Sequence, residues 1–428
     1  MDPVRSLKKL PRLSAVLLLA VAFIVMPGVS SPALADEEEG ICEPGPNGDN
    51  LNQTPWHANR MNLDLAHPHS KGMYPNGDRV TVAVVDSGVE SSHPAFGGRV
   101  IEGFDGPDPP KIGMCDGDGH GTAVAGIIAG GSDDTRYEGV APEAEIWPAR
   151  IIPSVDTQVS EDERELLSSW IAEGIHEAVD AGVDIINISA GGVASTELET
   201  AVNEAIADDI VVVAAVGNDS EFLDDASQPA AYPAMYDGVI AVGSITSEGS
   251  WHEMSNFGEA VEIVAPGHDI AGPAPGGVGY RMEMEGTSFA TPQVAGTAAL
   301  LRAKFPDADS EWIRNRLFAT ADPPGGADNN FYGHGIVNPY RALTDLEENV
   351  LSPEEAEEDE NAIMVPVEDE AQDQWAAVVD PLENVRMAAM YVLIGSVTSI
   401  IIVVVLRKLI PVGRKRGWAP GTRKSLDD

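Results

Sequence analysis

Positive charge and cysteine are both scarce in this sequence. Its 428 residues include 26 lysines and arginines but 69 aspartates and glutamates, and the formal net charge is −43 at pH 7. We expect no nucleic-acid partner, because binding phosphates requires the opposite sign of charge. Only Cys42 and Cys115 are present, so the chain can form at most one internal disulfide and has too few cysteines for a cysteine-rich zinc site.

Long apolar runs are scarce as well, and the two that stand out lie near the ends. Residues 1–35 begin with basic residues, continue with an apolar run over 15–25 and close on Ala33-Leu34-Ala35. This pattern predicts a signal peptide that is cleaved before Asp36. An uncleaved N-terminal anchor is the alternative.

The second run, residues 387–406, is uncharged, mostly apolar and long enough to cross a bilayer. It predicts one C-terminal transmembrane helix, with a buried core helix as the alternative. A basic tail follows over 407–428, whereas an acidic stretch precedes the run. The positive-inside rule therefore predicts a single-pass protein of the cell membrane, with a cytoplasmic C-terminus and residues 36–386 on the extracytoplasmic side.

Two polar stretches flank the central part of the chain. Residues 346–386 are rich in glutamate and should form an extended, flexible linker, since like charges repel and little can be buried. Residues 36–78 are too short and polar to form much of a core, so we predict an extension that wraps the central domain, residues 79–345. Its anchors on that domain are expected to be Trp56, Leu63 and Leu65.

The same extension contains histidines and one of the two cysteines. His57, His67 and His69 match no known metal-site spacing and are expected at the surface, so no metal and no cofactor is predicted. Export permits oxidation, and a disulfide between Cys42 and Cys115 is expected. Two free thiols or a metal site are the alternatives.

Residues 79–345 alternate short apolar segments with longer helical ones. This alternation predicts an α/β fold with a doubly wound parallel sheet and helices on both faces. The segments expected as strands are 80–85, 184–189, 210–216, 239–242 and 261–264. The segments expected as helices are 122–129, 166–181, 198–207, 288–304 and 310–319, the last with Ser310 as its N-cap.

Three separated motifs supply the residue types of nucleophilic catalysis. Ser288 stands in Gly-Thr-Ser-Phe-Ala-Thr-Pro at the start of a helix, where unpaired N–H groups can bind an oxyanion. A serine hydroxyl needs a base, and the base needs an acid that orients it; His120 and Asp86 are the candidates. Alone, each motif could be a helix cap or a turn, but together they predict a catalytic triad.

In their order Asp, His, Ser these motifs resemble the subtilisin-like (S8) serine proteases. The resemblance implies a serine endopeptidase that acts on protein or peptide substrates, with Asn218 as the oxyanion donor at the end of an apolar strand. It also implies that the substrate backbone pairs with an exposed strand edge. The substrate-binding residues implied in this way are Ser189, Ala190, Gly191, Ala215 and Gly217.

A signal peptide, a short extension, the string Gly-His-Gly-Thr-Ala-Val-Ala-Gly and a C-terminal anchor together resemble the mycosins, membrane-anchored proteases of type VII secretion. This resemblance implies membrane proteins of a secretion complex as partners. Two alternatives stay open: the chain mainly braces such a complex, or it is a general cell-surface subtilisin unrelated to secretion.

Overall fold

The computed structural model describes most of the chain between residues 45 and 346. The described ranges are 45–106, 114–131, 136–152, 161–223, 231–323 and 329–346. All of them belong to the first of two compact units, Met1–Ala356, and the second unit is Glu357–Asp428.

Several predicted segments lie outside the described residues. They are the signal peptide (1–35), the linker beyond residue 346, the membrane helix (387–406) and the basic tail (407–428). Within the described ranges, no helix combines the length and the apolar character that crossing a bilayer requires.

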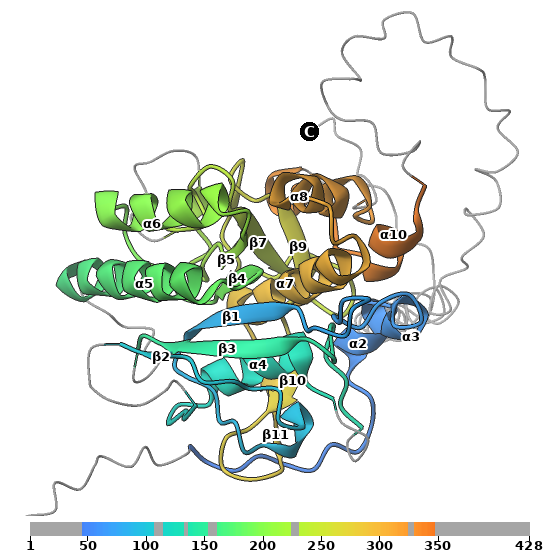
Figure 1. Ribbon diagram of the computed structural model, residues 1–428. Coiled ribbons are helices and arrows are strands. Elements are labelled where there is room, and N and C mark those ends of the chain that lie inside the picture. Colours follow the sequence, from blue (N-terminus) through green and yellow to red (C-terminus); the bar gives the residue numbers. More distant parts are fainter. Residues whose placement is uncertain are drawn as a thin grey trace, which may run out of the picture. The chain divides into compact units, whose positions relative to one another are not determined.

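A seven-stranded sheet lies at the centre of the fold, and all of its neighbouring strands are parallel (Figure 1). In spatial order the strands are β2 (Phe104–Asp105), β3 (Glu145–Arg150), β1 (Thr81–Asp86), β4 (Ile185–Ile188), β5 (Val211–Ala215), β7 (Ile240–Ile245) and β9 (Ile263–Pro266). From β1 the chain continues first to β2 and β3 on one side and only later to β4 on the other. The carboxyl ends of β1 and β4 therefore form a topological switch point, where open α/β sheets bind ligands.

Helices cover both faces of the sheet, because alternate side chains of each strand point to opposite sides. In β1, Val82 and Val84 pack in the core cluster that contains α4 (His120–Ala129) and α7 (Thr287–Lys304). Ala83 and Val85 pack in the other cluster, which contains α5 (Glu161–Ala181) and α6 (Thr196–Ala207). The predicted α/β fold with a parallel sheet between two helical layers is thus confirmed.

Helix α7 is buried almost throughout its length, and this explains its small residues. It contacts α4 and the strands β4, β5, β7 and β9, so little room remains for side chains. At Gly296 an added Cβ would lie only 2.6 Å from the Cβ of Val140. The alanine-rich composition of this helix reflects close packing on both of its sides.

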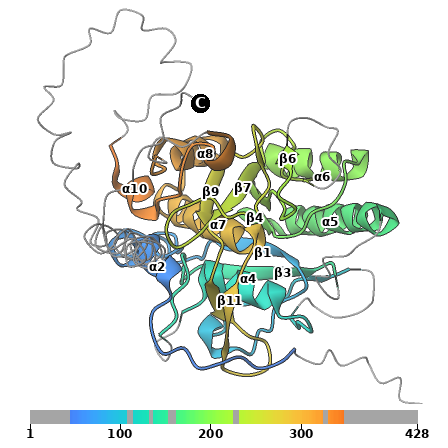
Figure 2. The ribbon, with the colours of Figure 1, turned by 180° about the vertical axis from the view of Figure 1, so that it is seen from behind.

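The remaining elements are short. They are η1 (Pro94–Phe96), the parallel pair β6 (Phe222–Leu223) and β8 (Phe257–Gly258), the antiparallel pair β10 (Ile270–Pro273) and β11 (Tyr280–Met284), α8 (Ser310–Ala319), α9 (Asn329–Tyr332) and α10 (Pro339–Thr344). The β10–β11 pair lies beside α4, and α8 packs on α7 (Figure 2).

All five predicted strands and all five predicted helices have a counterpart, with ends shifted by a few residues. The prediction missed β3, which carries Pro148 in its middle and charged residues at both ends. It also missed β10, β11, α9, α10 and the two-residue strands. The N-cap of α8 is Asp309, whose carboxylate accepts a hydrogen bond from the N–H of Trp312, so the assignment of Ser310 as N-cap was wrong.

The extension is more ordered and more buried than expected. Residues 56–66 form two short helices, α2 (Trp56–Arg60) and α3 (Leu63–Ala66), and Met61 between them is fully buried in the main core. The surface placement of His57 and His67 was therefore wrong, since both are buried and their Nε2 atoms lie 3.2 and 3.0 Å from the carbonyl oxygens of Ala271 and Val140; His69 is exposed as predicted. This polar segment has too few apolar residues for a core of its own, and its buried residues pack into the core of the α/β domain.

Two of the three predicted anchors, Trp56 and Leu63, pack in or against the main core. The side chain of Leu63 is 4% exposed and that of Trp56 packs against the main core, but Leu65 is 48% exposed. The indole Nε1 of Trp56 donates hydrogen bonds to the carbonyl oxygens of His268 and Asp269, at 3.2 and 2.8 Å. The helical turn of α3 separates the two leucines onto different faces, which the sequence pattern alone did not reveal.

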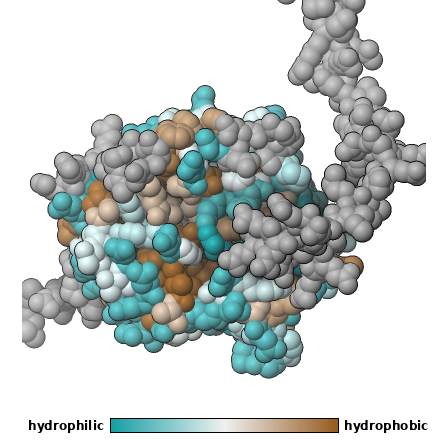
Figure 3. Space-filling model, turned by 90° about the horizontal axis from the view of Figure 1, so that it is seen from above, coloured by the Kyte–Doolittle hydropathy of each residue, from teal (hydrophilic) through white to brown (hydrophobic). Residues whose placement is uncertain are grey.

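Exposed hydrophobic residues are spread over several elements of the described part. Seen from above, hydrophilic residues cover much of the surface and hydrophobic residues lie in separate patches between them (Figure 3). Leu65 of α3, Leu166 of α5 and Val278 between β10 and β11 are examples. Such scattered apolar exposure is ordinary for a folded protein.

The two leucines of α3 give a matched test of the buried extension. Leu63→Ala should lower the free energy of unfolding by about 2–4 kcal/mol, because it leaves a cavity in the shared core. Leu65→Ala should change it by no more than about 0.5 kcal/mol. Thermal and urea unfolding of the full-length protein measure both values, and equal effects would contradict the packing of α3 described here.

Candidate active site

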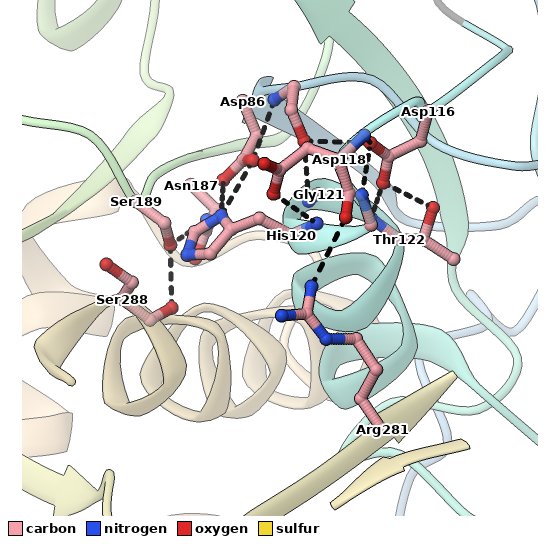
Figure 4. A network of polar contacts seen from close by, with 12 residues as sticks. Asp86, Asp116, Asp118, His120, Gly121, Thr122, Asn187, Ser189, Arg281 and Ser288 are labelled. Atoms are coloured by element: carbon pink, nitrogen blue, oxygen red, sulfur yellow. Dashed lines mark hydrogen bonds and ion pairs between the residues drawn. The ribbon is translucent and has the colours of Figure 1, made fainter. Parts of the chain in front are cut away.

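Three predicted residues meet at the switch point of the sheet. Asp86 is the last residue of β1, His120 is the first residue of α4, and Ser288 lies in the first turn of α7. The imidazole of His120 lies between the Asp86 carboxylate and the turn that carries Ser288 (Figure 4). Residues that are about 200 positions apart in the chain thus come together because strand ends and helix starts share one edge.

The contact between His120 and Asp86 is short and buried. The Nδ1 atom of His120 lies 2.8 and 3.0 Å from the two carboxylate oxygens of Asp86, which is fully buried. Burial alone would lower the pKa of His120, but the negative charge of Asp86 and this hydrogen bond outweigh it and raise the pKa above its ordinary value. The bond also fixes the proton on Nδ1, so Nε2 of the neutral ring is a proton acceptor.

The loop that presents His120 is organised by a residue that the sequence patterns did not single out. Asp116 is fully buried and accepts five hydrogen bonds from nearby N–H and hydroxyl groups. The donors are Ser87 Oγ, the backbone N–H groups of Asp118, Gly119 and Thr122, and Thr122 Oγ1. An aspartate in the glycine-rich string Cys-Asp-Gly-Asp-Gly-His typically forms a turn. This pattern could have identified Asp116 from the sequence.

The buried carboxylate of Asp116 connects the motif of Asp86 to the motif of His120. Ser87, which follows Asp86, donates its hydroxyl to Asp116 at 3.0 Å and accepts the N–H of Gly121 at 3.0 Å. Burial raises the pKa of Asp116, and the hydrogen bonds from Thr122 and Gly119 oppose that rise. Since all five partners are donors, the ionised carboxylate is the form that satisfies them.

The turn before Ser288 is held by the amide of Asn218. The Oδ1 atom of Asn218 accepts hydrogen bonds from Thr287 N–H at 2.8 Å and from Thr287 Oγ1 at 3.1 Å. Gly286 has φ of +135°, and an added Cβ would lie 3.1 Å from Nδ2 of Asn218, so a side chain is disfavoured at this position. With Oδ1 engaged in this way, Nδ2 is the atom of the Asn218 amide that can still donate hydrogen bonds.

The predicted substrate-binding residues fall into two groups. Ser189 is buried, accepts from Asn187 Nδ2 at 3.1 Å and donates to the backbone carbonyl of Ser288 at 2.9 Å, so it supports the turn of Ser288. Ala215 is 7% exposed. The more accessible members are Ala190, Gly191 and Gly217. These three are small and follow the carboxyl ends of β4 and β5.

The sequence of the catalytic part matches a known family. A model described as the subtilase family (Peptidase_S8) covers residues 77–335. The chain belongs to the subtilase family of serine endopeptidases. Subtilisin E of Bacillus subtilis (strain 168) is 37% identical over 271 residues, which make up 63% of this chain and 66% of that relative. Subtilisin Savinase of Lederbergia lenta is 36% identical over 285 residues, 66% of this chain and 96% of that relative.

Among solved structures, this subtilase resembles mycosin proteases. MycP1 solved with its N-terminal propeptide removed is 30% identical with a TM-score of 0.60, over 68% of this chain and 98% of that one. The MycP3 protease from the type VII (ESX-3) secretion system is 30% identical with a TM-score of 0.60, over 70% and 92%. MycP1 from Mycobacterium smegmatis is 29% identical with a TM-score of 0.60, over 71% and 89%.

The raised pKa of His120 sets the pH dependence of any reaction that needs its neutral ring. The ion pair of His120 with Asp86 stabilises the fold fully below the unfolded-state pKa of about 6.5, and this contribution is lost as pH rises through the higher folded-state value. We expect kcat/KM for a peptide substrate to rise with pH over a range above 6.5.

Asp86→Asn should move the titration of His120 to lower pH, because it removes the charge that raises its pKa, and should lower kcat by about 10⁴-fold. NMR titration of the His120 ring measures the shift independently of rate. Asp118→Asn is the matched control, since Asp118 raises this pKa less than Asp86 does. A shift in the control as large as in Asp86→Asn would contradict this account.

Proposed function

We propose that this subtilase hydrolyses peptide bonds with Ser288 as nucleophile, His120 as general base and Asp86 as the acid that orients the base. The observation that carries the proposal is the 2.8 Å contact of His120 Nδ1 with the buried Asp86, beside the helix turn of Ser288. His120 takes the proton of the Ser288 hydroxyl through Nε2 as the hydroxyl attacks the carbonyl carbon, and then gives it to the leaving amine. Asp86 stabilises the imidazolium between these steps.

The negative charge that develops on the carbonyl oxygen is stabilised by two donors. One is the backbone N–H of Ser288 at the start of α7, where N–H groups have no partner within the helix. The other is Nδ2 of Asn218, whose orientation is held by the bonds of Oδ1 to Thr287. Removing one such donor costs about 10²–10³ in kcat.

The substrate binds at the same edge of the sheet as the reacting residues. An extended peptide can add a strand beside Ala190 and Gly191, which follow β4, with Gly217 on the opposite wall. Main-chain hydrogen bonds then supply affinity, and the small, uncharged walls accept many side chains. The substrates are accordingly proteins or peptides in extended form.

The proposal extends to a mycosin at the cell membrane. It is supported by the similarity to MycP1 and to the MycP3 protease of a type VII secretion system, and by the sequence patterns at 1–35 and 387–406. In this arrangement the catalytic part faces the extracytoplasmic side and the basic tail, 407–428, faces the cytoplasm. Membrane proteins of the secretion complex are the proposed partners.

Bracing of a secretion complex without proteolysis is the second candidate function, and a secretion assay in the host separates the two. Replacing the gene with a Ser288→Ala copy should change secretion if cleavage is the main function. Unchanged secretion with lost peptide hydrolysis would instead identify bracing. Normal secretion after deletion of the whole gene would favour a general cell-surface protease.

Labelling with a phosphonofluoridate tests the nucleophile directly. The reagent should modify Ser288 in the native protein and should fail to react with Ser288→Ala, because only a serine beside its base is nucleophilic enough. Ser195→Ala is the matched control, since Ser195 caps α6 away from the site and its loss should leave labelling intact. Mass spectrometry of the labelled peptide locates the adduct, and an adduct on any other serine would refute the assignment.

A disulfide between Cys42 and Cys115 is part of the same proposal. Cys42 lies outside the described residues, but the N–H of Gly45 donates to the carbonyl of Asp116 at 3.0 Å, directly after Cys115. Three residues of chain span at most roughly 10 Å, so this contact brings the two cysteines into the same neighbourhood. The bridge would fasten the extension to the loop that carries His120.

Mass mapping of non-reduced peptides should recover Cys42 and Cys115 in one linked peptide. Reduction, or a Cys42→Ser variant, should lower the free energy of unfolding by about 4 kcal/mol, since the bridge closes a loop of some 70 residues in the unfolded chain. Both thiols found free in oxidising buffer would rule the bridge out.

A further inference from the structure

Three side chains with metal-binding atoms converge directly before the Ser288 turn. The ligand atoms of His252, His268 and Glu285 all lie within 4.8 Å of one another. The Nε2 atoms of His252 and His268 are 3.9 and 3.7 Å from the same carboxylate oxygen of Glu285. The two imidazole rings are 5.0 Å apart between centroids and are steeply inclined to each other, at 62°.

The three residues come from separate segments that are already held in place. His252 follows β7, and its backbone N–H donates to the carbonyl of Ser244 at 3.0 Å. His268 lies between β9 and β10, and Glu285 follows β11. The N–H of Gly286 donates to the carbonyl of Gly267 at 2.8 Å, which joins the neighbours of Glu285 and His268. The cluster is therefore preorganised by backbone contacts.

The distances between the nitrogen atoms of the two histidines and the Glu285 carboxylate fit an ion held between them better than direct hydrogen bonds. Both nitrogen–oxygen separations exceed the usual 2.7–3.2 Å of a hydrogen bond. Ligands held at roughly 2.0–2.1 Å in a tetrahedral zinc site are about 3.4 Å apart. The two nitrogen–oxygen pairs thus need to move closer by about 0.5 and 0.3 Å to hold an ion, and no pair of ligand atoms needs to move closer by more than about 1.4 Å.

The surroundings of the His252 ring resemble those of a bound metal ligand. Nδ1 of His252 is 3.0 Å from Oγ of the fully buried Ser244, which orients the ring and leaves Nε2 toward Glu285. Nδ1 of His268 is buried and has no hydrogen-bond partner within the described residues. The side chains of His268 and Glu285 are 42% and 50% exposed, so an ion can enter from solvent.

We propose that His252, His268 and Glu285 bind one zinc ion. Two imidazoles and one carboxylate are a typical zinc ligand set, whereas calcium and magnesium prefer oxygen ligands alone. A water molecule completes the coordination. The ion cross-links three segments next to Gly286 and so stiffens the turn that leads to Ser288.

Zinc binding to the full-length protein tests the proposal independently of proteolysis. The protein is prepared without a polyhistidine tag, in the Ser288→Ala background to prevent self-cleavage, and stripped with a chelator. Zinc chloride is then titrated against a chromophoric chelator, and bound metal is counted by mass spectrometry. We expect one tightly bound zinc per chain and a higher melting temperature with zinc than without it.

Ligand variants locate the ion. His252→Gln and Glu285→Gln should each weaken zinc binding by about 100-fold or more, and Ser244→Ala by about 10-fold to 100-fold through the orientation of His252. His176→Gln is the matched control, because His176 also lies beside a glutamate, with Nδ1 2.9 Å from Glu204, but belongs to no such cluster within the described residues. The control should bind zinc as the parent does.

Two results would overturn the proposal. One is a parent protein that binds no zinc with a dissociation constant below roughly 10 µM. The other is zinc binding that is equal in the parent, His252→Gln and Glu285→Gln. If His252→Gln does not fold, as judged by circular dichroism, His268→Gln decides the matter, because that partly exposed side chain can be replaced with little change in the core.

Discussion

The hydrogen bond from His120 Nδ1 to the buried carboxylate of Asp86 is the interaction on which the geometry of the site depends. It links the end of β1 to the start of α4 and places one imidazole nitrogen away from the acid, toward α7. A buried negative charge is costly unless it is paired and hydrogen-bonded. Asp86 is stabilised by His120 and by the N–H of Ser87, so the arrangement that orients the base also makes the buried acid tolerable.

A second buried acid gives this site its rigidity. Asp116 accepts hydrogen bonds from the loop before His120, from Thr122 in α4 and from Ser87 after Asp86, so it links the two motifs. On the other side of the cleft, Ser189 and Asn218 hold the turn around Ser288 by its carbonyl and by Thr287. These contacts keep the reacting groups at fixed distances, which is the main contribution a protein makes to this chemistry.

The extension reaches the same turn through a short series of contacts. Trp56 donates to the carbonyls of His268 and Asp269, the neighbouring Gly267 accepts from Gly286, and Ser288 follows two residues later. The proposed zinc ion would strengthen this connection at Glu285. The loop of residues 267–269 thus contacts both the extension and the segment that leads to Ser288.

The sequence by itself determined five of the seven strands of the sheet, the main helices and the candidate triad, because buried parallel strands are continuous apolar runs and nucleophile, base and acid stand in distinctive glycine-rich strings. The tertiary structure decided where the short, polar segments lie and which residues they contact. Burial of Met61 and Leu63, the role of Asp116 and the meeting of His252 with His268 and Glu285 all depend on contacts between distant segments. No local period or spacing encodes such contacts, since they arise only when separate loops are brought to one edge of a folded sheet.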